Sequence, residues 1–199
     1  MIAASELADT VRAAWQRRWP ECPAIAYQLR GCYPERWVRF HSLPGSKRYA
    51  DDASEYATIL DRHNTVLTEL SPGVSLIIIT CDWTGQNDPP VQRAPLQAKL
   101  DPGGVHWSTV QPDPDDEADF QVYWHLFASR RTWRPGILDD LLRAVADDEL
   151  SNVIVGPSDL RWLYHPYDGG ADVILPSRAD RDELRNRHCE RLSGHPAGL

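Results

Sequence analysis

The six residues Val74–Ile79, which read VSLIII, constrain the fold of this chain more than any other segment. A continuous run of apolar, mostly β-branched side chains is typical of a strand that is buried on both faces. Such a strand needs a covering layer on each side of its sheet, and helices can supply those layers. The segment therefore predicts an α/β domain in which helices flank a central sheet.

The residues before this run predict a strand–helix–strand unit. Residues Trp37–His41 alternate, with Val38 and Phe40 on one face, as in a half-buried strand. Residues 52–70 place apolar side chains at helical spacing, and Asp52 begins a capping-box pattern. If the two strands are parallel neighbours, the crossover is right-handed and both strands end at the same edge of the sheet.

Further elements complete a single domain that spans residues 1–199, because this length suits one sizeable core. We predict a mixed α/β (α+β) fold: a single mixed β-sheet with a βαβ unit, an added antiparallel part and flanking helices. The additional strands are expected at Val105–Val110, Phe120–Phe127 and Asn152–Val155 and in a hairpin with arms Arg161–Tyr164 and Ala171–Leu175. The additional helices are expected from Ser5 to before Pro20, at Ile137–Ala146 and from Ser177 onward.

Charge and composition limit the classes of partner that the chain is expected to bind. The chain carries 21 Lys and Arg against 29 Asp and Glu, a formal net charge of -8, which disfavours nucleic acid as a partner. An acidic balance suits a basic protein partner, although solubility alone explains acidity in most soluble proteins. No apolar run spans a bilayer and the first residues lack the apolar core of a signal peptide, so we expect no membrane partner and a cytoplasmic location.

The edge where the two strands end is where open α/β sheets usually bind ligands, and we predict a site there. An imidazole, hydroxyls and two cations at this edge can hold a phosphate or carboxylate and move a proton. The alternatives are that Lys47 and Arg48 pair with Asp51 and Asp52 or simply face water, and that Asp82 caps its own loop. The candidate residues are His41, Ser42, Lys47, Arg48 and Tyr49 from one loop and Asp82 and Trp83 from the other.

The segment HPYDGG at residues 165–170 is a second candidate. His165, Tyr167 and Asp168 are exposed contacts if this loop belongs to the site, whereas Asp168 and the two glycines also suit an ordinary turn. His63 lies on the apolar stripe of its helix, where a buried histidine with a hydrogen-bond partner is the common case. Trp83, like the other tryptophans, marks an interface only if it is exposed.

Motifs for the common cofactors and metals are missing from the sequence. The residues PGSKR at 44–48 lack the order of a phosphate-binding P-loop, and there is no GxGxxG, GxSxG, HExxH or EF-hand pattern. Four cysteines are widely spread without a CxxC pair. We therefore expect no cofactor and no bound metal.

Four segments carry a resemblance to a known family: RWVRFHSLPGSKRY, HNTVL, VADDELSNVIV and WLYHPYDGGADVIL. Together they span most of the chain, and they resemble an uncharacterised bacterial family of domains of unknown function. The resemblance implies no activity, cofactor or catalytic residue.

Two functions from different classes are consistent with these patterns. We expect a binding or regulatory module, of the immunity type, that recognises another protein. The alternative is a small metal-independent enzyme that acts on an anionic ligand, with His41 as general base and Lys47 and Arg48 stabilising negative charge. A deep pocket that holds His41, Arg48, Asp82 and His165 within hydrogen-bond reach would favour the enzyme.

Overall fold

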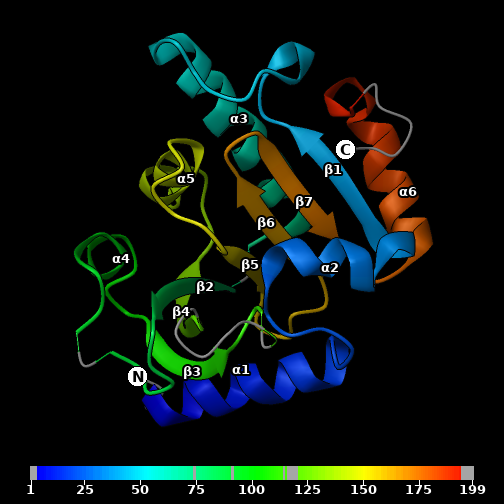
Figure 1. The fold of residues 1–199 in the computed structure, drawn as a ribbon. Coiled ribbons are helices and arrows are strands. Elements are labelled where there is room, and N and C mark those ends of the chain that lie inside the picture. The colour runs from blue at the N-terminus through cyan, green and yellow to red at the C-terminus, as the bar shows by residue number, and fades with distance from the viewer. Residues whose placement is uncertain (1–3, 74, 91, 114, 116–120, 194–199) are drawn as a thin grey trace.

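A single seven-stranded sheet forms the centre of the protein (Figure 1). The computed structural model describes residues 4–73, 75–90, 92–113, 115 and 121–193. The strand order is β1-β7-β6-β5-β2-β4-β3, and each of these neighbouring pairs is antiparallel. The strands are β1 (Trp37–His41), β2 (Ser75–Thr84), β3 (Val105–Val110), β4 (Tyr123–Thr132), β5 (Ile154–Pro157), β6 (Leu163–Tyr167) and β7 (Gly170–Ile174).

Helices pack on both faces of this sheet, as the doubly buried strand requires. One face contacts α1 and α2, and the other contacts α3, α5 and α6. The α-helices are α1 (Ala4–Arg18), α2 (Ala26–Cys32), α3 (Ala53–Leu70), α4 (Pro95–Leu100), α5 (Asp139–Ala146) and α6 (Arg178–Arg187), and short 3-10 turns are η1 (Pro34–Arg36), η2 (Pro44–Ser46) and η4 (Cys189–Arg191).

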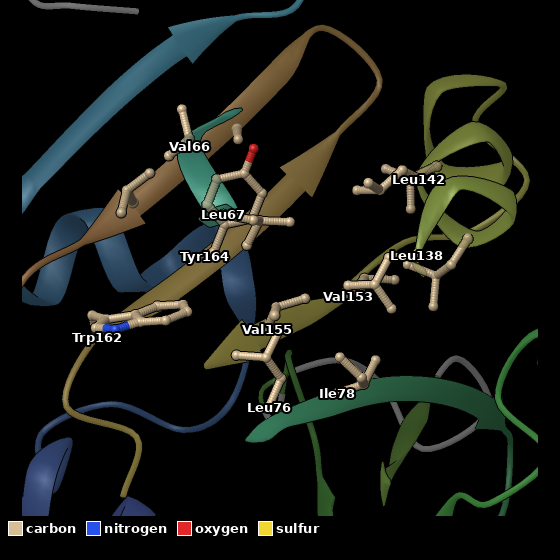
Figure 2. Packing of buried hydrophobic residues seen from close by; sticks show 14 of the residues in the cluster. Val66, Leu67, Leu76, Ile78, Leu138, Leu142, Val153, Val155, Trp162 and Tyr164 are labelled. Carbon is tan, nitrogen blue, oxygen red and sulfur yellow. The ribbon is translucent and has the colours of Figure 1, made fainter. Parts of the chain in front are cut away.

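Strand β2 supplies both hydrophobic cores. Its side chains alternate, so that Leu76 and Ile78 join the core under α3 and α5, while Ile77 and Ile79 join the core under α1 and α2. All four side chains have no exposed surface. Figure 2 shows Leu76 and Ile78 in the first of these cores, with Leu142 of α5 in the same cluster. The predicted α/β class, with one sheet and flanking helices, is confirmed.

The predicted parallel pairing of β1 with β2 is wrong. Strands β7, β6 and β5 lie between them, and no neighbouring pair in the sheet is parallel. Four antiparallel steps nevertheless give β1 and β2 the same direction, so both end at the same edge, as expected. At about 4.8 Å per step, their ends lie about 19 Å apart.

The hairpin is tighter than predicted. Strand β6 extends to Tyr167 and β7 begins at Gly170, which leaves only Asp168 and Gly169 in the turn. His165 and Tyr167 therefore lie on a strand rather than in an exposed loop. The short helices α2 and α4 were not expected from periodicity, and Val74 and Phe120, at the starts of two predicted strands, lie outside the described residues.

None of the helices in the described ranges is both long enough and apolar enough to cross a membrane.

Candidate functional site

The loop that follows β1 and the HPYDGG segment, both predicted to contribute to a site, meet at Asp168. Strand β7 pairs with both β1 and β6, which places the loop after β1 beside the β6–β7 turn (Figure 1). The backbone N–H of Ser42 donates to the Gly169 carbonyl at 3.0 Å. The Asp168 carboxylate is 6% exposed, accepts a hydrogen bond from the Tyr49 hydroxyl at 2.9 Å and forms an ion pair with Arg48. Arg48 and Tyr49 thus fix the position of the turn.

Lys47 and Arg48, the two cations that were expected to hold an anion, both have carboxylate partners. Lys47 Nζ donates to Asp51 at 2.7 Å and to Glu55 Oε1 at 2.6 Å, and these bonds raise the pKa of Lys47 above its ordinary value. The hydrogen bond to Asp168 likewise raises the pKa of Arg48. The pairing of Lys47 with Asp51 is the alternative that the sequence allowed, and each of the two cations has its charge balanced by a carboxylate in direct contact.

Ser42 lies inside the protein with His63 and Tyr164. Its Oγ is 3.2 Å from His63 Nε2, and His63 Nδ1 is 2.6 Å from the Tyr164 hydroxyl. Ser42 is 3% exposed and Tyr164 is 1% exposed. Burial lowers the pKa of His63 to about 4, so the ring is neutral at pH 7. The group is inaccessible to a substrate, and its role is to satisfy buried polar atoms.

A hollow of about 170 Å³ opens beside the turn, on the face of the sheet that carries α2. Aromatic rings of Tyr27, Trp124 and Tyr167 contribute to its wall, and Tyr27 contacts Trp124 edge to face at 6.2 Å. The carboxylates that line it are Asp148 and Asp168. The hollow therefore combines aromatic surface with the negative charge of Asp148, because the carboxylate of Asp168 is paired with Arg48.

The imidazole among the residues that line this hollow is that of His165. Its Nδ1 is 2.9 Å from the Val153 carbonyl, which is only an acceptor, so Nδ1 carries the proton and Nε2 carries the lone pair. Burial lowers the pKa of His165, although the neighbouring Asp172 opposes that shift. His165 is therefore neutral at pH 7 and presents a hydrogen-bond acceptor.

A charged pair that the sequence did not single out supports this face. Arg39 donates to both oxygens of Asp172, at 2.7 and 2.9 Å, and its guanidinium lies 4.7 Å from the centre of the Tyr167 ring. Asp172 pairs in register with Arg39 on one side and His165 on the other. Burial raises the pKa of Tyr167 to about 12. The sequence did contain a signal for this pair, because Arg39 is a charged residue between Val38 and Phe40 of a half-buried strand.

The backbone is strained at two positions of the hollow. Asp148 and Asn152 have φ angles of 58° and 53°, in the left-handed region that favours glycine. The side chain of Asn152 explains one of them: its Oδ1 accepts from Ala26 N–H at 2.7 Å and its Nδ2 donates to the Ala24 carbonyl. Asn152 thereby holds the start of α2, and with it Tyr27, against the sheet.

Exposed aromatic side chains concentrate at this edge. Within the described residues, the large hydrophobic side chains that are exposed are Tyr27 at 46%, Tyr49 at 49% and Trp83 at 69%. Tyr27 itself lines the hollow. Trp83 pairs in register with Trp124, and the Tyr49 hydroxyl donates a hydrogen bond to Asp168, so these two side chains each adjoin a residue of the hollow. Trp83 thus meets the condition of exposure that the sequence left open.

Asp82 and His41 do not join the hollow. Asp82 is 4% exposed, accepts from Arg93 at 3.2 Å and projects from β2 on the side of Ile78, whereas His165 projects on the opposite face of the sheet. His41 is partly buried, and burial lowers its pKa. Of the four residues whose convergence would favour an enzyme, His165 alone lines the hollow, and Arg48 reaches it through Asp168.

In the part of the chain that the structure describes, no group of three or more His, Cys, Asp or Glu side chains is placed to hold a metal ion.

Comparison with known protein families gives one match. The model of the family described as Domain of unknown function (DUF3885) matches residues 25–196, which is more than half of the chain. The chain belongs to this family. Neither the curated proteins nor the solved structures yield a significant match. The region shared with DUF3885 begins just before α2 and includes every residue named above as lining the hollow.

Proposed function

We propose that this edge of the sheet is a docking surface for a basic segment of another protein, and that the hollow takes one Lys or Arg side chain of that segment. The exposed aromatic residues of the described chain, gathered around one acidic hollow, are the observation that carries the proposal. Clustered exposed aromatic side chains are enriched at protein interfaces. Such a surface suits a regulatory or immunity-type module, which acts by covering its partner.

The charge of the surface selects a basic partner. Asp148 lines the hollow, and Asp147 and Glu149 beside it are exposed. The whole chain has a net charge of -8, which attracts a cationic segment over longer range. An ammonium or guanidinium group next to Tyr27 and Trp124 would also gain cation–π attraction.

The size of the hollow favours a side chain over a metabolite. Small-molecule sites usually enclose roughly 300 to 1,000 Å³, whereas this hollow encloses about 170 Å³. The enzyme alternative also requires free cations for an anionic substrate, and Lys47 and Arg48 are paired with carboxylates. The geometry of this edge therefore supports a binding module better than an enzyme.

The occupancy of the hollow can be tested by NMR titration with N-acetyl-lysinamide and N-acetyl-argininamide. At least one of them should shift the Trp124 indole signal and the backbone signals of Tyr27 and His165 in a saturable way. Uncharged N-acetyl-norleucinamide is the matched control and should not. Asp148→Asn should weaken binding about fivefold, because it removes one charge and asparagine tolerates the left-handed backbone.

The partner can be tested by photo-cross-linking in the native cell, with a benzophenone amino acid in place of Tyr27 or Trp83. Both positions should cross-link to a Lys- or Arg-rich segment of the same protein, and the yield should fall in the Asp148→Asn background. A probe in place of the exposed Arg17 on α1 is the control and should not trap that segment. Cross-links that map to acidic or uncharged segments, or none at all, would refute the proposal.

A further inference from the structure

A second hollow, of about 490 Å³, lies at the opposite end of β4. Its wall includes Ser129 and Arg131 from β4, Arg134 from the segment that leads to α5, and Gly103 from the loop between α4 and β3. Ser129 and Arg131 pair in register with Ile78 and Leu76, so their side chains project on the face of the sheet that carries α3 and α5. Arg131 lies seven positions along the strand from Trp124, which is about 23 Å.

The charge of this hollow opposes that of the chain as a whole. Arg130, Arg131 and Arg134 all line it, although the chain carries a net charge of -8. Arg130 and Arg134 are exposed, and neither side chain has a hydrogen bond or ion pair within the described residues. The guanidinium of Arg134 is therefore available to a ligand. Arg130 pairs in register with Ile77, so its side chain projects on the opposite face of the sheet from Ser129 and Arg131.

Arg131 is held in place by one of its nitrogens and keeps other N–H donors unpaired within the described residues. One of its nitrogens, Nη2, donates to the Leu100 carbonyl at 2.6 Å and lies 4.0 Å from Asp101 Oδ1. Asp101 is the negative charge next to this site, but it is fully buried, and its other oxygen accepts from Thr80 and Arg93. Guanidinium carries five N–H donors, so Arg131 keeps most of them for an incoming acceptor.

Ser129 provides an independent sign of a missing partner. The residue is 3% exposed, and its Oγ has no hydrogen-bond partner, although it lines the hollow. Leaving a buried hydroxyl unsatisfied is unfavourable, and native proteins seldom do so without a reason. An oxygen atom of a ligand seated among the arginines would satisfy this hydroxyl.

We propose that this hollow binds a small organic molecule through a phosphate or carboxylate group. Planar guanidinium groups match both oxyanions in bidentate geometry. The volume lies within the range of small-molecule sites. The Ser129 hydroxyl completes the site by donating to one oxygen of the anion. The site is independent of the protein-docking edge, because it has the opposite charge and lies at the other end of the sheet.

Calorimetric titration at physiological salt tests the site with three probes: inorganic phosphate, glycerol 3-phosphate and succinate. At least one should bind with one-to-one stoichiometry, and the comparison of the three identifies which oxyanion is preferred and whether the organic part contributes. Arg134→Gln should weaken that probe at least about tenfold, because a charged hydrogen bond is lost. Arg17→Gln changes an exposed arginine of α1 that has no hydrogen bond or ion pair within the described residues, so it matches the change in net charge and should leave affinity unchanged.

Ser129→Ala separates a binding role from a structural one. It should weaken the probe several-fold while the ligand-free protein keeps or raises its melting temperature, because an unsatisfied hydroxyl is removed. Unchanged affinity in Ser129→Ala would overturn the role of the hydroxyl. The proposal as a whole fails if none of the probes binds, or if Arg134→Gln and Arg17→Gln weaken binding equally. Asp148→Asn should not affect these titrations, so the two proposals can fail separately.

Discussion

At the scale of single residues, burial decides what a reactive side chain does. Ser42 and His63 are 3.2 Å apart, and the same pair of residue types acts as nucleophile and base in hydrolases. Here both residues are 3% exposed, and the other ring nitrogen of His63 faces the Tyr164 hydroxyl. No carboxylate contacts the ring in the described structure, and Arg191 adds to the cost of a positive charge. The histidine is therefore kept neutral.

The buried His63 should make the protein less stable in mild acid. Its pKa is about 4 in the folded state and about 6.5 when unfolded, so the unfolded state binds more protons between these values. The free energy of unfolding should be unaffected by His63 above about pH 7 and should fall, by on the order of 3 kcal/mol, as the pH drops from 6.5 to 4. Urea unfolding at several pH values in wild type and His63→Gln measures this contribution.

Burial also lowers the pKa values of His41, His106 and His165, and these groups titrate in both wild type and His63→Gln. The difference in unfolding free energy between wild type and variant therefore isolates the contribution of His63. Equal pH slopes for wild type and variant would show that His63 does not carry the effect.

At the scale of elements, a close approach of two strands positions the turn that forms part of the docking edge. A Cβ atom added at Gly170 would lie 2.0 Å from the Phe40 carbonyl oxygen of β1, which is far inside contact distance. The neighbouring Gly169 is less constrained, because its Cβ would meet the Tyr167 ring at 3.0 Å. Gly170 thus allows β7 to lie against β1, and this contact sets Asp168 beside Arg48 and Tyr49.

We expect Gly170→Ala to lower the free energy of unfolding by about 1–3 kcal/mol or more, because strand backbone must shift to admit the methyl group. Gly31→Ala in α2 is the matched control: nothing lies within 4 Å of its added Cβ. That change should stabilise the protein by roughly 0.5–1 kcal/mol, since alanine is the better helix former. Denaturant unfolding of both variants provides the comparison, and a Gly170→Ala variant as stable as wild type would contradict the steric account.

At the scale of the whole molecule, two cores share one sheet. The core under α3 and α5 and the core under α1 and α2 both take side chains from β2, β5, β6 and β7. Loss of either core therefore exposes one face of the strands that support the other. We therefore expect the two cores to unfold together.

Unfolding should accordingly occur in one cooperative transition. Tryptophan fluorescence and far-ultraviolet circular dichroism should give coincident curves in urea. Val11→Ala in α1 and Val66→Ala in α3 each truncate one core and should each shift the whole transition to lower urea, by loss of about 1–3 kcal/mol. Two separated transitions, or a variant that moves only one of the two signals, would contradict the prediction of a single domain.

The sequence by itself determined the elements and the faces of most of them. The predicted bounds of Trp37–His41 and Val105–Val110 are those of β1 and β3, and Asp52 caps α3 by accepting from the N–H groups of Ser54 and Glu55. These features follow from local periodicity and from hydrogen bonds between residues close in the chain. Such patterns depend on residues that are close in the chain, and tertiary packing is consistent with them.

Only the tertiary structure decided which elements are neighbours, and with that the site. Periodicity tells which face of a strand a side chain takes, but it does not tell which strand pairs beside it. For this reason Asp82 and His165 were expected together and lie on opposite faces, whereas Tyr27, Trp124 and Asp148 were not foreseen and line one hollow. Strand pairing depends on burial summed over the whole chain, so contacts between distant residues emerge only when the chain has folded.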